Sequence, residues 1–156
     1  MNHERVGKLV ETLEWLRNTP ELPEGTGFNI CTWKHTNCQT TYCLAGWYAV
    51  KNPESGLRFV LPNWANARKD DFYLTAKEEF DVAEVPTEVL AEHFDLPGEL
   101  MEALFLGEES PVSVCSGQYG DRVAWSTGAL KSFNRYMADP VGWLHNYDQE
   151  SNADYE

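Results

Sequence analysis

The sequence predicts an α-dominant α+β fold, with about four to six helices packed around a small antiparallel sheet of two or three strands. Three observations predict it. Apolar residues recur at helical spacing in several segments, two short apolar runs between them have the length of strands, and Pro and Gly separate the segments. With 156 residues and 42% apolar composition, the chain can bury one core. We expect a single globular domain over residues 1–147 and a flexible acidic tail over 148–156.

The first two helices are predicted in the N-terminal third. Residues 4–18 place their apolar side chains on one helical face and end before Pro20. Residues 41–51 form the second expected helix, and Thr40 or Thr41 is its expected N-cap because a hydroxyl can accept a hydrogen bond from a free backbone N–H.

The middle of the chain predicts a hairpin and then two closely linked helices. Residues 57–61 and 72–74 are expected to be its strands, since both are short and apolar. A helical pattern begins at Pro86, and a tight turn at residues 95–98 separates it from a second short helix.

The C-terminal third predicts one long helix. Residues 122–138 carry apolar side chains at helical spacing, after a loop over residues 110–120 that is rich in small residues. Pro140 is expected to open one further helical turn that contains Trp143 and Leu144.

The charge balance limits the classes of partner. There are 25 acidic and 12 basic residues, giving a net charge of −13. Such a chain repels nucleic-acid phosphates and anionic membranes, so neither is an expected direct partner, whereas a basic protein surface would attract it. The N-terminus shows no signal-peptide pattern, and no apolar run approaches the ~18 residues of a membrane span. We therefore expect a cytoplasmic protein whose cysteines are not in disulfides.

A cysteine-rich stretch offers three alternative kinds of chemistry. Thiolate and imidazole are the ligands that zinc prefers, and four such residues fall close together: Cys31, His35, Cys38 and Cys43. Their spacing differs from the paired knuckles of structural zinc sites, so the favoured interpretation is buried thiols without metal or other cofactor. A disulfide between Cys38 and Cys43 is the third alternative, and it requires an oxidising setting.

Catalysis by cysteine is a further alternative, as an enzyme or a small-ligand-binding protein built around Cys43 or Cys115. It would need a histidine near the thiol, and His93 is expected at the surface. No phosphate-binding loop, metalloprotease motif or nucleophile elbow is present in the sequence. The expectation is a protein that is not an enzyme.

The tryptophans divide into core and surface candidates. Trp15, Trp33 and Trp47 fit a core, whereas Trp64 lies in a polar segment and is the best candidate for an exposed anchor at an interface.

Residues 38–47 are the most specific part of the sequence, and their expected role is packing. Thr40 would cap a helix while Cys43 and Leu44 face inward. Gly46 would allow another backbone to approach closely, and Trp47 would fill the space beside it.

At these residues the chain resembles a group of uncharacterised small proteins encoded by phages and bacteria. Their core is a Trp followed by C-G-T-x-x-C-[LIF]-A-G-W/H, with a Leu-Phe pair on a later helix. Here the core reads as Trp33 and residues 38–47, with Gln39 in place of the usual Gly, and the pair is Leu104-Phe105. The resemblance covers roughly residues 5–106, and it implies a phage or prophage setting and a compact helical fold without supplying an activity.

The resulting functional hypothesis is a phage-type accessory protein that binds a host protein stoichiometrically. An acidic inhibitor of a nucleic-acid-handling or defence complex, similar to an anti-CRISPR protein or a DNA mimic, would present carboxylates where phosphates normally lie. The alternatives are the zinc-stabilised module and the cysteine-dependent enzyme or ligand-binding protein. The candidate partner-binding residues are Trp64, Asp70, Asp71, Glu78, Glu79, Asp81, Glu84, Glu108 and Glu109.

Overall fold

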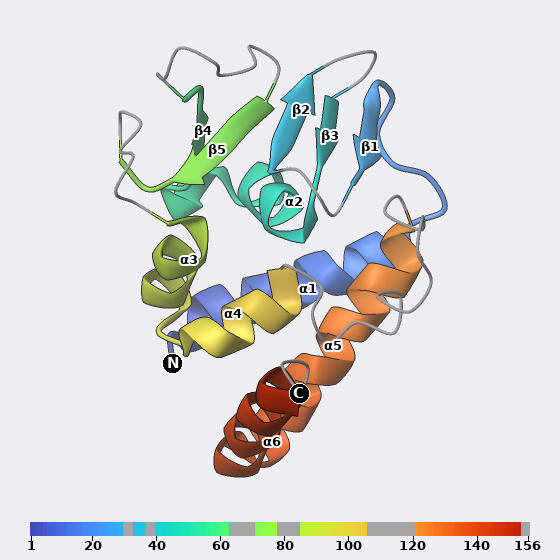
Figure 1. The fold of residues 1–156 in the computed structure, drawn as a ribbon. Helices are drawn as coiled ribbons and strands as arrows, with labels where there is room; N and C mark the ends of the chain where they lie inside the picture. The colour runs from blue at the N-terminus through green and yellow to red at the C-terminus, as the bar shows by residue number, and fades with distance from the viewer. Residues whose placement is uncertain (30–32, 37–39, 63–70, 78–84, 106–120, 154–156) are drawn as a thin grey trace.

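The computed structural model contains a layer of helices with a mixed β-sheet at one end (Figure 1). It describes residues 1–29, 33–36, 40–62, 71–77, 85–105 and 121–153. Within those ranges the chain forms six α-helices and five strands, which confirms the α-dominant α+β class. The expected size of the sheet was wrong, because it has five strands instead of two or three and one of its strand pairs is parallel.

Helices α1 (His3–Asn18) and α5 (Arg122–Ala138) pack across each other and form the centre of the helical layer (Figure 1). Both were predicted. The Asn2 side chain accepts a hydrogen bond from the Arg5 N–H at 3.1 Å and so caps α1. At its other end, the Arg122 guanidinium donates to the carbonyls of Leu16, Thr19 and Pro20. Arg122 thus joins the start of α5 to the end of α1.

Helices α3 (Pro86–Phe94) and α4 (Gly98–Phe105) are joined as the sequence predicts, through a tight turn. Asp95 makes this turn with a left-handed backbone, φ 54°. Helix α6 (Pro140–Ala153) is longer than the single turn expected after Pro140, and it continues into residues expected to be a loose tail. Its Trp143 ring stacks on Tyr147 at 5.2 Å between centroids.

The sheet has the strand order β1-β3-β2-β5-β4. Its strands are β1 (Thr26–Phe28), β2 (Lys34–Thr36), β3 (Thr40–Tyr42), β4 (Arg58–Val60) and β5 (Asp71–Thr75). The predicted β4–β5 hairpin is confirmed as an antiparallel pair. Strands β1, β2 and β3 were missed because each has only three residues, too few to show alternation of apolar and polar side chains.

The core fills the space among the helices and extends to the side of the sheet that faces them. Its largest fully buried side chains are Trp47, Tyr48, Phe94 and Phe105, together with several leucines. As expected for the core, Trp47 is buried, whereas Trp15 and Trp33 are only partly buried and pack against its margin. In the part of the chain that the structure describes, no helix has the length and apolar character needed to cross a membrane.

Candidate functional site

The motif over residues 38–47 begins helix α2 (Leu44–Lys51), and its cap differs from the prediction. Thr40 and Thr41 are not caps, because both lie in β3. Cys43 is the N-cap, and its Sγ accepts a hydrogen bond from the Gly46 N–H at 3.4 Å. The reason is that the backbone after β3 stays extended at Cys43, so the first free N–H groups of α2 face the sulfur and not a hydroxyl.

The Cys43 thiol is unsuited to nucleophilic chemistry. The residue is 1% exposed, and burial raises the pKa of its thiol to about 11. Since the thiolate is the reactive form, this sulfur stays protonated and inert near neutral pH. The expectation of an inward-facing, buried thiol is confirmed at this position.

Gly46 is the position where a second backbone approaches α2, as the sequence predicts. A Cβ built on Gly46 would lie 2.2 Å from the Trp33 carbonyl oxygen. The neighbouring Trp47 donates its indole N–H to the Gly27 carbonyl at 3.1 Å, which ties α2 to β1. Residues 43–47 therefore connect the sheet to the helical layer.

The zinc alternative involves two described residues, His35 and Cys43; Cys31 and Cys38 lie outside the described residues. Cys43 Sγ faces the backbone of α2, and His35 Nδ1 lies 2.5 Å from Asp71 Oδ1. Across the described ranges, no three His, Cys, Asp or Glu side chains are grouped to hold a metal ion. Cys115, the other candidate nucleophile, also lies outside those ranges.

His93 is buried, which corrects the expectation of a surface histidine. It is 7% exposed, and its Nε2 is 2.8 Å from the Tyr48 hydroxyl. Burial, with a smaller contribution from the nearby Arg5 charge, lowers the pKa of His93 to about 4, and burial raises the pKa of Tyr48 to about 12. Both groups are uncharged at neutral pH, and His93 also packs edge-on against Phe94. This pair is a hydrogen-bonded part of the core.

The structure joins one residue from each of the two predicted sets: His35 from the metal set and Asp71 from the acidic set. They are cross-strand partners on β2 and β5. Their neighbours Lys34, Phe72 and Tyr42 occupy the other sheet face, where Tyr42 packs on Trp47 of α2. Because successive side chains alternate between faces, the His35–Asp71 pair lies on the face directed away from α2.

Asp71 is the one candidate partner-binding residue within the described ranges, and it is half-buried. The remaining candidates lie outside the described residues: Trp64, Asp70, Glu78, Glu79, Asp81, Glu84, Glu108 and Glu109. In the sequence, six of the eight acidic candidates fall within the fifteen residues 70–84. Residues 70–84 contain those six carboxylates and one base, Lys77, and β5 occupies the N-terminal third of this segment.

Two features of the structure depend on tertiary contacts and were not predicted from the sequence. One is the His35–Asp71 pair, whose members are 36 residues apart. The other is a set of basic residues on α1 and α5 that line one groove. A signal for the second feature exists in the sequence, because residues 122–138 contain three bases and no acid.

Comparison with known proteins gives no information on function, so the functional argument uses the structure and the sequence. We compared the chain with models of protein families, with curated proteins and with solved structures, and none of the three comparisons gave a match.

Proposed function

We propose that this chain is a phage-type accessory protein that acts without catalysis, by stoichiometric binding of a host protein with a basic surface. The site of action is the host cytoplasm, and the target class is a nucleic-acid-handling or defence complex. The contact region is β5 with the residues that continue the chain at its two ends.

The concentration of negative charge around β5 carries the proposal. Residues 70–84 hold six of the chain's 25 carboxylates against one base. Asp71 at the start of β5 is held on the sheet by His35, so one carboxylate of the set has a fixed position on a strand. Carboxylates fixed on a rigid element lose little conformational entropy on binding, and they complement a basic groove that normally takes phosphates.

Two described candidates for catalysis support a binding role over chemistry. The Cys43 thiol is buried and caps a helix, and His93 is buried against Tyr48. Both side chains therefore contribute to the fold where a catalytic group would need access to a substrate.

A comparison of two variants of equal charge tests the proposal. The β5 variant neutralises Asp70→Asn, Asp71→Asn, Glu78→Gln and Glu79→Gln. The control variant neutralises exposed residues of α1 and α3: Glu11→Gln, Glu14→Gln, Glu88→Gln and Glu92→Gln. Each protein is immobilised and exposed to lysate of the bacterial host at about 50 mM and about 300 mM salt, because screening weakens charge contacts at the higher value.

The expected result is that wild type and control variant retain the same basic protein at low salt and that the β5 variant loses it. The purified partner should bind in a 1:1 ratio by calorimetry, and it should release its nucleic acid when the wild-type chain is added. Capture of no basic protein at low salt contradicts the proposal. Equal losses for the two variants contradict it as well, because net charge and not the β5 region would then govern binding.

A further inference from the structure

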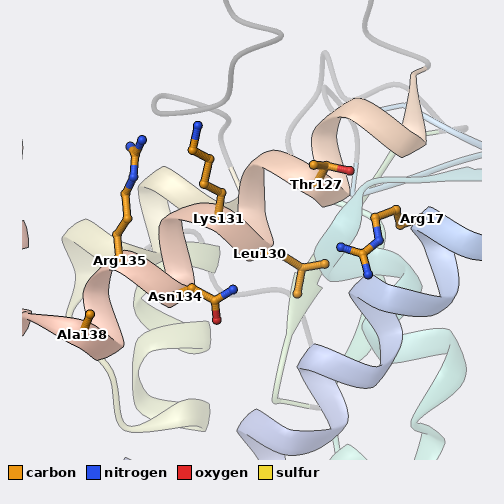
Figure 2. A pocket seen from close by; sticks show the side chains of 7 residues that line it. All are labelled: Arg17, Thr127, Leu130, Lys131, Asn134, Arg135 and Ala138. Carbon is orange, nitrogen blue, oxygen red and sulfur yellow. The ribbon is translucent and has the colours of Figure 1, made fainter.

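A groove between α1 and α5 has the opposite charge to the rest of the molecule. It has a volume of about 530 Å³ and is lined by Arg17, Thr127, Leu130, Lys131, Asn134, Arg135 and Ala138 (Figure 2). Three of these residues are basic and none is acidic, in a chain where acids outnumber bases by 25 to 12. Figure 2 shows Lys131 and Arg135 extending side by side from α5, with Arg17 on the neighbouring α1.

The cations in this groove are available to a ligand. Within the described part of the chain, none of the three forms an ion pair with an acidic side chain. The Arg17 Nε–H donates to the neutral amide oxygen of Asn18 at 3.4 Å. By contrast, Lys8 on the same α1 is paired with Glu54 at 2.9 Å. Lys131 and Arg135 are both exposed.

Helix electrostatics account for only part of this arrangement. Arg17 and Arg135 lie in the last turns of α1 and α5, where a positive charge is favourable. Lys131 lies one turn earlier on α5. Since like charges four residues apart on a helix repel each other, Lys131 and Arg135 disfavour each other until an anion lies between them.

The remaining lining residues suit a small organic anion. The Thr127 hydroxyl and the Asn134 amide provide neutral hydrogen-bond donors, and Leu130 and Ala138 provide apolar surface beside the charges. The groove is widely open to solvent, so charge and hydrogen bonds, and not enclosure, would hold a ligand there. Guanidinium groups bind phosphate oxygens in a bidentate manner, and a lysine adds a point charge.

We propose that the α1–α5 groove binds a phosphate-bearing small molecule of nucleotide size, with Arg17, Lys131 and Arg135 contacting its phosphates. This site is separate from the β5 region and does not depend on the binding function proposed above. It gives an acidic protein a local site for an anionic metabolite.

Calorimetry on the full chain with inorganic pyrophosphate, ATP and citrate tests the proposal. An ionic strength of about 0.15 M is suitable, because it screens the repulsion of distant carboxylates while leaving contacts inside the groove strong. We expect pyrophosphate and ATP to bind one site more tightly than citrate. Lys131→Gln and Arg135→Gln should each weaken binding about tenfold or more, since each removes one charged donor.

Arg58→Gln is the matched control. Arg58 is exposed on β4, outside the groove, and its substitution removes the same charge. Unchanged ATP affinity in Arg58→Gln together with the losses above supports the site. Failure of pyrophosphate and ATP to bind overturns the proposal, and so does equal weakening by Arg58→Gln. Preference for citrate, or binding of acidic peptides only, overturns the phosphate assignment. Circular dichroism of each variant confirms that the fold is retained.

Discussion

Replacement of Gly46 by Ala tests the central packing contact of the fold. The added Cβ would lie 2.2 Å from the Trp33 carbonyl oxygen and 3.0 Å from Tyr42 Cβ. The nearest atom belongs to the backbone, so no rotation of a side chain can relieve the contact. The sheet and α2 must instead move apart by roughly 1 Å, although protein interiors are close-packed and resist such movement.

The expected effect on the free energy of unfolding is the difference of two terms. Overpacking of this kind costs up to about 3 kcal/mol. Ala is favoured over Gly within a helix by up to about 1 kcal/mol, which offsets part of that cost. The net expectation for Gly46→Ala is a loss of about 2 kcal/mol, or a decrease of roughly 4–8 °C in Tm for a chain of this size.

Gly7→Ala on α1 is the matched control, because a Cβ at Gly7 meets nothing within 4 Å. It should stabilise the protein by up to about 1 kcal/mol through helix propensity alone. Urea denaturation followed by tryptophan fluorescence measures both variants, since Trp47 is buried beside Gly46. If Gly46→Ala is as stable as wild type or more stable, the close approach of the Trp33 carbonyl is wrong.

Three further outcomes follow from buried or hydrogen-bonded groups. Burial lowers the pKa of His93 to about 4, so the stabilisation from neutral His93 is complete above about pH 6.5 and is lost as the pH falls toward 4, by about 3 kcal/mol in all. In His93→Gln, the free energy of unfolding from denaturation curves should lose this part of its dependence on pH. Burial raises the pKa of the Cys43 thiol to about 11, so iodoacetamide at pH 8 should modify Cys43 only in denaturant, and peptide mass spectrometry that finds modification of the folded protein would contradict this burial. Arg122→Lys keeps the charge but loses the planar fork that contacts three carbonyls, and calorimetry should show a loss of about 1–3 kcal/mol, whereas an unchanged Tm would count against this contact.

Of the three longest helices, α1 and α5 were predicted correctly, whereas α6 was expected to be a single turn. Helices α1 and α5 have 16 and 17 residues and show a full apolar face. The β4–β5 hairpin was also found, because its strands are apolar and lie between polar segments. Strands β2 and β3 contain no alternation of apolar and polar residues, and all six of their residues are half-buried in the structure. Their pairing depends on neighbours that are distant in the sequence.

For residues 38–47, the sequence predicted the packing role of Gly46 correctly but assigned the N-cap of the helix to the wrong residue. A glycine followed by a tryptophan predicts a close backbone approach, and the contact between Gly46 and Trp33 confirms it. The cap was assigned to Thr40 or Thr41, because hydroxyls are the usual N-cap groups. β3 continues through both threonines, so the sulfur of Cys43 occupies the cap position instead.

The amino-acid sequence by itself determined the helical class, the excess of negative charge and the dense acidic segment around β5, because these properties follow from local composition and periodicity. The tertiary structure alone decided which polar groups meet. It paired His35 with Asp71 across two strands, buried His93 against Tyr48, and brought Arg17 of α1 into one groove with Lys131 and Arg135 of α5. Such contacts join residues that are far apart in the chain, and their energies depend on burial and on the partner, neither of which a local pattern contains.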